Sequence, residues 1–402
     1  MAEQGRSLIA YVGSYAGPTG PADAGIRIYA VDPDTGSMVP VSSTMPQMEA
    51  GFLCCSPDGN FLYGVDERKN DGRGPVGPEA SVKAFAVGSD DGRLSLLNSQ
   101  TAFGAFPTYV SVDPKRRWVV TASHGSFEHV ERIVRTASGF QIEHLYDDST
   151  LALYPVSENG ELEPACDVWV FEGHGKDPSD SVQVGRHPQA SPHAHSATFD
   201  PAGRFILVCE KSADKIYTFA IDERAAKFSR PRIYSVPPGS APRHPVFHPS
   251  KPFVFVTNEM ASTVSSYRYD SATGALAHIE TVRTIFSEMA GNAPADCQIH
   301  PSGRLLLVNN RGVDNLASFE IDEVSGRLSF RDSYPLAESL HPGVAARSFA
   351  FDPSGRYVFA ADRPANAILT LAVEVSTGRL SRVSTTPVPR PGFILVKQTN
   401  VR

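Results

Sequence analysis

One pattern of apolar and polar residues recurs six times along the chain. Each copy begins with a proline turn, continues through a short run of aliphatic, β-branched or aromatic residues, and ends on polar residues. The copies are SPDGNFLYGVDE (56–67), DPKRRWVVTASH (113–124), DPAGRFILVCEK (200–211), HPSKPFVFVTNE (248–259), HPSGRLLLVNNR (300–311) and DPSGRYVFAADR (352–363). Because turns of this kind join short strands, each copy predicts a β-hairpin.

The spacing of these copies predicts the architecture. Their prolines are separated by 57, 87, 48, 52 and 52 residues, which gives a period of about 50 with one long interval. After each copy comes a third strand-like run, such as KIYTFAID, and a Thr-Gly or Ser-Gly turn then leads to a fourth. Four strands in each period of this length are typical of a β-propeller blade.

A seventh blade is divided between the two ends of the chain. IAYVGSY and GIRIYAVDPDTGSM match the outer three strands of a blade, and PGFILVK (391–397) can supply its inner strand. Sharing one blade in this way closes the ring and removes its open edges. We therefore predict an all-β fold, with residues 1–402 forming one seven-bladed β-propeller of four-stranded antiparallel blades. An open array or a β-sandwich is the alternative, but a sandwich has no reason to repeat one turn six times.

Three loops exceed the length that the repeat requires. The third blade carries 22 additional residues at about 125–146, and smaller excesses lie at 16–24 and 69–78. All three fall between a second and a third strand, and the irregular stretch 172–195 enters at the same end of the blades. Because long loops on one face usually mark the functional side, we expect the 125–146 insertion to lie on the face that binds substrate.

The repeat also predicts which side chains meet at that face. Both the end of the second strand and the start of the inner strand should lie at one mouth of the central channel. Ten residues after each proline stand Glu67, His124, Lys211, Glu259, Arg311 and Arg363. Six residues before each proline stand Gly51, Thr108, His195, Arg243, Ala295 and Arg347. All six residues that stand ten positions after a proline are titratable. This favours a polar pocket over the alternative, which is solvated strand ends with salt bridges between blades.

The chemistry of this mouth favours an anionic small molecule. Cationic residues outnumber Glu67 and Glu259, and arginine presents a planar fork that suits carboxylate or phosphate. His195 is the proton-transfer candidate because the ordinary pKa of histidine is closest to neutral. Glu259 among arginines is either their counter-ion or a general base. His187, His193 and Asp296 are further candidates for the pocket, with a purely structural role as the alternative for the two histidines.

Metal and cofactor chemistry is weakly indicated. The sequence contains no HExxH, Walker A, GxSxG or GxGxxG motif in the strand and helix context that each requires. Oxygen ligands for a divalent cation in the channel could come from Asp66, Glu67, Asn258, Glu259 and Asn310. Because the neighbouring arginines would repel a cation, we expect neither a metal nor a cofactor.

Composition narrows the partners further. With 37 Lys and Arg against 44 Asp and Glu, the net charge is -7, and no basic tract suggests a nucleic-acid footprint. The sequence has no apolar run of signal-peptide or membrane-span length, so we expect a cytoplasmic protein that does not bind membranes. Five scattered cysteines without CxxC spacing are interpreted as reduced thiols. The oligomeric state is not predicted.

Several phrases resemble the seven-bladed propeller lactonase family. They are SPHAHSATFDPAGRF, GSAPRHPVFHPSKPFVFVTNE, CQIHPSGRLLLVNNRGVDNLASFEID and ARSFAFDPSGRYVFAAD. This family includes propeller-type 6-phosphogluconolactonases and carboxy-cis,cis-muconate cyclases, and the resemblance covers nearly the whole chain. It implies a catalytic set of His195, Glu259, Arg243 and Arg311, with Arg347 as a further pocket arginine. To the substrate-binding set we add the mouth residues Glu67, His124, Lys211, His193 and Asp296. The chain departs from the family at the 125–146 insertion and at HPSKPF, which lacks the turn glycine.

The resemblance implies a hydrolase of carbohydrate metabolism that opens an anionic sugar lactone, like 6-phosphogluconolactonase. In that reaction His195 or Glu259 activates water, while arginines orient the substrate and stabilise the developing oxyanion. A lactone-forming cyclase would use the same residues differently and is one alternative. The other is a non-catalytic binding scaffold, which should present an apolar or aromatic surface rather than a polar mouth.

Overall fold

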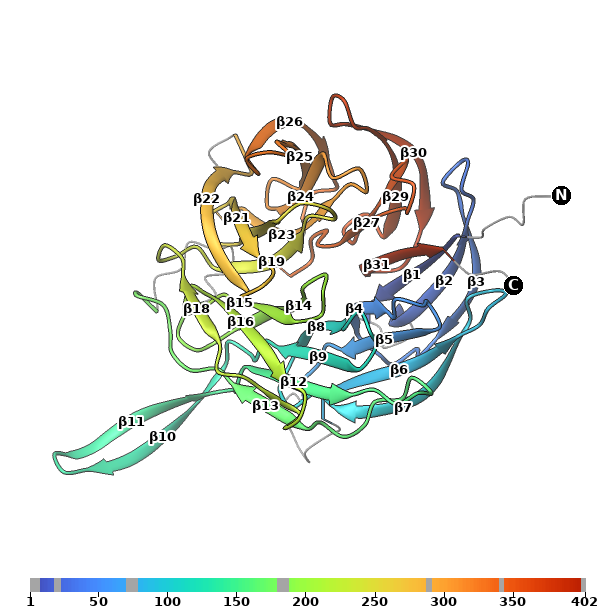
Figure 1. Cartoon of the computed structure of the whole chain (residues 1–402). Helices are drawn as coiled ribbons and strands as arrows, with labels where there is room; N and C mark the ends of the chain where they lie inside the picture. Colours follow the sequence, from blue (N-terminus) through green and yellow to red (C-terminus); the bar gives the residue numbers. More distant parts are fainter. Residues whose placement is uncertain are drawn as a thin grey trace.

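The computed structural model describes residues 8–17, 23–69, 79–178, 188–286, 291–339 and 343–398. Their strands form seven antiparallel sheets arranged around a central axis, and one separate two-stranded hairpin (Figure 1). The predicted seven-bladed β-propeller is therefore confirmed. In the part of the chain that the structure describes, no helix is long and apolar enough to cross a membrane.

The N- and C-terminal strands share one blade, as predicted. The sheet order is β3-β2-β1-β31, and the C-terminal strand pairs antiparallel with β1 at the centre of the ring. Backbone pairing between the two ends of the chain thus closes the ring without leaving an open edge there. The four strands are β1 (Leu8–Ser14), β2 (Gly25–Val31), β3 (Met38–Thr44) and β31 (Pro391–Gln398).

The next three blades follow in chain order, each from its inner to its outer strand. The second blade contains β4 (Ala50–Cys55), β5 (Phe61–Asp66), β6 (Ser81–Val87) and β7 (Leu94–Thr101). The third contains β8 (Pro107–Val112), β9 (Trp118–Ser123), β12 (Thr150–Pro155) and β13 (Asp167–Val170). The fourth contains β14 (Ala194–Phe199), β15 (Phe205–Glu210) and β16 (Lys215–Asp222), with an outer edge in two pieces, β17 (Lys227–Phe228) and β18 (Arg232–Ser235).

The last three blades are more regular. The fifth contains β19 (Pro242–Phe247), β20 (Phe253–Asn258), β21 (Thr263–Asp270) and β22 (Ala275–Arg283). The sixth contains β23 (Ala293–Ile299), β24 (Leu305–Arg311), β25 (Asn315–Ile321) and β26 (Leu328–Pro335). The seventh contains β27 (Phe349–Phe351), β28 (Tyr357–Asp362), β29 (Ala367–Glu374) and β30 (Arg379–Pro387).

The hydrophobic core lies between neighbouring blades. One cluster joins Phe253 and Phe255 of β20 to Leu306, Val308 and Phe319 of the next blade, all with almost no solvent exposure. Second strands such as β20 are buried on both faces, whereas outer strands such as β22 alternate between partly buried and exposed positions. Burial of apolar surface between sheets is therefore what holds each blade to its neighbours.

The insertion in the third blade forms a hairpin of its own. Strands β10 (His129–Thr136) and β11 (Gly139–Tyr146) pair only with each other and project away from the ring (Figure 1). Ser126 at the base of the hairpin donates to Asp147, which also pairs with Lys69 at 2.7 Å. Of the two smaller loops, residues 70–78 and 18–22 lie outside the described residues.

Candidate active site

Irregular pairing at the start of the inner strands directs side chains into the central channel. In the fourth blade, Ala194 pairs with Glu210 and Ser196 with Cys209, so His195 is an additional residue in its strand. Such β-bulges re-aim side chains and are frequent near functional sites. The same irregularity recurs in five of the other six inner strands, at Gly51, Thr108, Arg243 with His244, Ala295 with Asp296, and Gly392.

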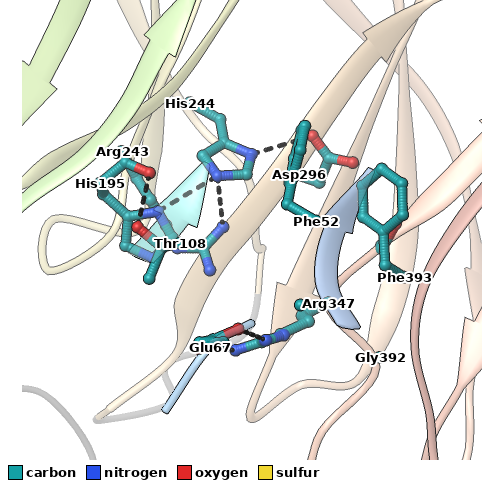
Figure 2. Close-up of a pocket in the computed structure, with 12 residues that line it drawn as sticks. Phe52, Glu67, Thr108, His195, Arg243, His244, Asp296, Arg347, Gly392 and Phe393 are labelled. Atoms are coloured by element: carbon teal, nitrogen blue, oxygen red, sulfur yellow. Dashed lines mark hydrogen bonds and ion pairs between the residues drawn. The ribbon is translucent and has the colours of Figure 1, made fainter. Parts of the chain in front are cut away.

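All of these residues except Ala295 line one pocket at the centre of the propeller (Figure 2). The pocket has an empty volume of about 290 Å³, including space open to solvent. Seven blades contribute to it, because each inner strand starts at the same mouth. Its lining is Gly51, Phe52, Glu67, Thr108, His195, Arg243, His244, Asp296, Arg347, Ser348, Gly392 and Phe393.

A chain of three polar side chains crosses this pocket. The Nδ1 atom of His244 lies 3.1 Å from Oδ1 of Asp296, and its Nε2 atom lies 3.2 Å from Nδ1 of His195 (Figure 2). Arg243 extends the network, with Nη1 at 3.3 Å from the same Nε2 atom. All four residues are at most 7% exposed, so these polar groups depend on one another for hydrogen bonds.

The network assigns the tautomer of each imidazole. Arg243 can only donate hydrogen bonds, so Nε2 of His244 accepts and Nδ1 of His244 carries the proton that is donated to Asp296. Since Nε2 of His244 is an acceptor, Nδ1 of His195 donates to it. The remaining nitrogen of His195, Nε2, is then left with a lone pair for accepting a proton.

Burial keeps both imidazoles neutral. It lowers the pKa of His244 to about 4, with Arg243 adding to the effect and Asp296 opposing it. Burial, together with Arg243 and His244, lowers the pKa of His195 well below its ordinary value of 6.5. Because both rings are uncharged at neutral pH, His195 is in the protonation state of a general base.

Glu259 is the centre of a buried ion cluster directly behind Arg243. Its Oε1 atom lies 2.8 Å from Nζ of Lys211, and its Oε2 atom lies 2.8 Å from Nε of Arg243 and 3.0 Å from Nη2 of Arg311. Burial acts to raise the pKa of Glu259, but Lys211, Arg311 and Arg243 outweigh it and hold the pKa well below its usual range. A carboxylate held this firmly by three cations is a weak base and positions Arg243.

A second ion pair lies on the other side of the pocket. Arg347 contacts both carboxylate oxygens of Glu67, at 2.5 Å and 3.3 Å (Figure 2). Tyr15 donates to the same carboxylate at 2.5 Å. Burial raises the pKa of Glu67 to about 8, opposed by Arg243 and Arg363. The bidentate contact with Arg347 favours the carboxylate whereas burial favours the protonated form, so the charge of Glu67 changes with pH near neutrality.

Gly51 makes room for this pair. A Cβ atom at position 51 would lie 1.9 Å from Oε2 of Glu67, a distance at which the carboxylate must move. Gly392 has the same function for Tyr15, whose ring lies 2.0 Å from the position of a Cβ there. Side chains are thus absent at two points of the mouth where Glu67 and Tyr15 approach the backbone.

The two predicted histidines beside His195 form a stacked pair. The rings of His124 and His193 lie 4.3 Å apart with an interplanar angle of 11°, and His124 meets His195 edge-on at 5.5 Å. Nδ1 of His193 contacts the backbone oxygen of His124 at 2.8 Å. Phe127, which precedes the hairpin, packs on His193 at 4.4 Å. These rings form a wall next to His195.

The ten residues predicted for the site therefore lie in one connected region. Five line the pocket: Glu67, His195, Arg243, Asp296 and Arg347. Lys211, Glu259 and Arg311 form the ion cluster behind Arg243, and His124 and His193 stand beside His195. His187 lies outside the described residues.

Sequence reasoning missed His244 and the aromatic rings below it. Arg243 and His244 are adjacent, so regular alternation would direct them to opposite faces, and only the bulge between Pro242 and Pro245 brings both to the pocket. The phrase PRHP, which precedes the fourth of the six repeat copies, was the available signal. Phe52 packs on Phe393 at 4.4 Å and meets His244 edge-on at 6.1 Å, and neither ring was predicted.

Four of the five residues proposed as channel ligands for a cation have oxygens that are occupied by other contacts. Both oxygens of Glu67 face Arg347, and both oxygens of Glu259 face cationic side chains. Asp66 pairs with Arg68 at 2.6 Å. Oδ1 of Asn310 accepts a hydrogen bond from Nδ2 of Asn292, whereas Oδ1 of Asn258 is buried without a hydrogen-bond partner among the described residues. This donor set fits arginine and lysine better than a divalent ion.

Comparison with known proteins gives one consistent family. The model of the family described as "Lactonase, 7-bladed beta-propeller" matches residues 9–396. A 6-phosphogluconolactonase of Bacillus subtilis is 26% identical over 388 residues, covering 95% of this chain and 96% of the relative. A probable 6-phosphogluconolactonase of Arthroderma benhamiae is 28% identical over 386 residues, covering 93% and 84%.

A solved structure agrees in fold over the full length. The crystal structure of a putative 6-phosphogluconolactonase from Bacteroides fragilis superimposes with a TM-score of 0.78 at 27% identity. The match covers 97% of this chain and 98% of that one. The similarity therefore includes every blade of the propeller.

Proposed function

The chain belongs to the seven-bladed β-propeller lactonase family, and we propose on that premise that it hydrolyses an anionic sugar lactone, as 6-phosphogluconolactonases do. One observation supports the reaction above the others. The hydrogen-bonded chain from Asp296 through His244 to His195 ends in a pocket that two arginines, Arg243 and Arg347, also line. A base and cationic groups in one cavity are what ester hydrolysis requires.

In the proposed mechanism, Nε2 of His195 accepts a proton from a water molecule. The water oxygen then attacks the lactone carbonyl carbon and forms a tetrahedral oxyanion, which the guanidinium of Arg243 stabilises. When the bond between that carbon and the ring oxygen breaks, the proton on His195 passes to the leaving oxygen. The products are a hydroxyl group and a carboxylic acid, which ionises and releases one proton to the solvent, and His195 returns to its neutral state.

Asp296 and His244 act as positioning residues for this base. They fix which nitrogen of His195 carries a proton, so the other nitrogen is always available to accept one. Glu259 has a comparable relation to Arg243, because its carboxylate holds Nε of the guanidinium at 2.8 Å. We therefore assign general-base catalysis to His195 and not to Glu259.

An anionic substrate is favoured by the balance of charge. The pocket and the ion cluster behind Arg243 together contain four cationic side chains and three acidic ones. The cations are Lys211, Arg243, Arg311 and Arg347, and the acids are Glu67, Glu259 and Asp296. Four minus three leaves one net positive charge. Arg347 is the group best placed to bind an anionic substituent, since Glu67 can be neutralised by protonation near neutral pH.

The test is a pH-stat assay of lactone hydrolysis, corrected for spontaneous opening of the ring. Wild type, His195→Gln and Arg347→Ala are compared on 6-phosphogluconolactone and on gluconolactone, which lacks the phosphate. We expect His195→Gln to lower kcat on both substrates, and Arg347→Ala to raise KM mainly for the phosphorylated one. His278→Ala, which removes an exposed histidine of β22, is the control. Absence of enzymatic turnover on every lactone would contradict the proposal.

A further inference from the structure

The hairpin inserted in the third blade carries a group of side chains that the reaction does not use. In its register, Glu131 stands directly opposite His144, and His129 stands opposite Tyr146. Because alternate residues of a strand share a face, His129, Glu131 and His144 lie on the same face of the hairpin. All three side chains are exposed to solvent.

The three side chains also approach one another closely. One potential ligand atom from each lies within 4.8 Å of the others. Nε2 of His144 is 3.7 Å from Oε1 of Glu131, and the rings of His129 and His144 meet edge-on with centroids 4.8 Å apart. The two imidazoles come from different strands and converge with the carboxylate on one point above the sheet.

We propose that this cluster binds a transition-metal ion of the Zn²⁺ class, and we call it the hairpin site. Two imidazole nitrogens and one carboxylate oxygen are a recurring protein ligand set for Zn²⁺, with a fourth position left for water. Imidazole also distinguishes this class from Mg²⁺ and Ca²⁺, which prefer oxygen ligands. The site is separate from the central channel, where arginine and lysine contact the carboxylates.

Only small side-chain movements are needed to complete the hairpin site. Ligand atoms that are each about 2.1 Å from one ion lie at most about 4.2 Å apart, and about 3.4 Å apart in a tetrahedron. The observed separations, within 4.8 Å, exceed the tetrahedral value by at most about 1.4 Å. Exposed side chains reach such positions by rotating about their χ angles, so the backbone of the hairpin need not change.

The surroundings of the site are compatible with a cation. Arg135 shares this face of the hairpin, but its guanidinium lies over the ring of Phe140, at 5.0 Å from the centroid. Arg132 stands opposite Glu143 on the other face. Tyr146 packs against His129 at 5.4 Å and restricts its ring.

A metal ion would also act on the hairpin itself. An isolated two-stranded hairpin is at best marginally stable in water, and β10 and β11 pair only with each other. Because its ligands come from both strands, a bound ion would cross-link β10 and β11. This cross-link would lie at the base of the hairpin, the end closest to the ring. We therefore expect metal binding to protect residues 129–146 from amide hydrogen exchange.

The experiment is a titration of the tag-free full-length protein with Zn²⁺ and Co²⁺, using competition with a chromophoric chelator. We expect one saturable equivalent for wild type, and at least tenfold weaker binding for His129→Ala and for His144→Ala. Glu131→Gln keeps the shape of the side chain but removes its charge, and should weaken binding by a smaller factor. His278→Ala is the matched control, because it removes an exposed histidine from another blade.

Two further readouts separate this site from the lactonase reaction. Bound Co²⁺ should give ligand-field absorption bands that disappear in His144→Ala, and Zn²⁺ should slow hydrogen exchange in residues 129–146 alone. Because the three side chains are exposed, their substitution leaves the propeller core unchanged. Wild type without a saturable equivalent, or variants that bind as wild type does, would overturn the proposal.

Discussion

His195 and His244 face each other across neighbouring blades, with Nδ1 of His195 at 3.2 Å from Nε2 of His244. Each comes from a bulged inner strand, β14 or β19, so the contact depends on two independent irregularities of pairing. Asp296, on β23 of the sixth blade, holds Nδ1 of His244 at 3.1 Å. The protonation state of the proposed base is therefore set by residues from three blades.

Substitution of Asp296 tests this dependence. Asp296→Asn keeps the shape of the side chain, but its amide can donate to Nδ1 of His244 and reverse the tautomers of both imidazoles. By analogy with other histidine bases that lose an orienting carboxylate, we expect kcat to fall by roughly 10²- to 10⁴-fold, with little change in KM. Steady-state kinetics on 6-phosphogluconolactone measures this. Asp90→Asn, which changes an exposed residue, is the control. Equal kcat in both variants would contradict the role of the hydrogen-bonded chain from Asp296 through His244 to His195.

The pH dependence of the reaction follows from the burial of His195. Its pKa lies well below 6.5, so the neutral base persists as the pH falls through 6.5. Because protonation of Glu67 near neutral pH affects substrate binding, the readout is kcat, which we expect to stay constant from neutral pH to below 6.5 and to decline only at lower pH. A profile with its acid limb at 6.5 or above would show that His195 is not the titrating base.

Stability must be measured in parallel, because burial of neutral histidines also affects folding. Burial lowers the pKa of His124, His195 and His244 in the folded state, so the unfolded chain binds more protons at acid pH. The stability that these groups contribute is present above about 6.5 and is lost as the pH falls toward their folded-state pKa values. Samples held at low pH and assayed again at neutral pH separate reversible titration from unfolding.

The repeat made the fold and the general position of the site predictable. Proline spacing gave the blades and their closure, and counting from each proline found His195, Arg243 and Arg347 at one mouth. The same count placed Ala295 in the ring, whereas the structure has Asp296 lining the pocket, because two residues oppose one at that bulge. A period-two pattern of side chains cannot predict where a strand contains an extra residue. The position of such a bulge depends on how the strand pairs with its neighbour.

The pairing of charges was less predictable than their position. Sequence reasoning found an excess of cations, but the structure has Lys211, Arg243 and Arg311 around the single carboxylate of Glu259. The pairing of cations with carboxylates depends on the side-chain rotamers of residues in three blades. The repeat pattern of the sequence does not predict these rotamers. The 125–146 insertion was found by its length, while its hairpin register became visible only in the structure.

Substitution of Gly51 tests the Glu67–Arg347 pair while both charged residues are kept. In Gly51→Ala, the new Cβ would occupy the position of the Glu67 carboxylate, which must move away from Arg347. Release of Arg347 from its counter-ion should strengthen binding of an anionic substrate, so we expect KM for 6-phosphogluconolactone to fall several-fold. KM for uncharged gluconolactone should stay unchanged. A parallel change for both substrates would indicate a general distortion of the pocket.

Removal of the charge on Glu259 should be costly for folding as well as for activity. Glu259→Gln leaves Lys211, Arg243 and Arg311 buried or nearly buried without their common counter-ion. Breaking a buried pair by removing one partner typically costs about 3–5 kcal/mol, because the remaining charge is not solvated. Urea unfolding followed by tryptophan fluorescence measures the free energy of unfolding directly.

The matched control for this variant is Glu320→Gln, which removes the partner of Arg331 on an outer face where both side chains are 41% exposed. Exposed pairs contribute about 0–1 kcal/mol, so this variant should unfold almost as wild type does. If Glu259→Gln were equally mild, the cations would be solvated in the folded protein and Arg243 would be free to move. In that case Glu259 could not be the group that positions Arg243 for the oxyanion, and kcat should be unchanged as well.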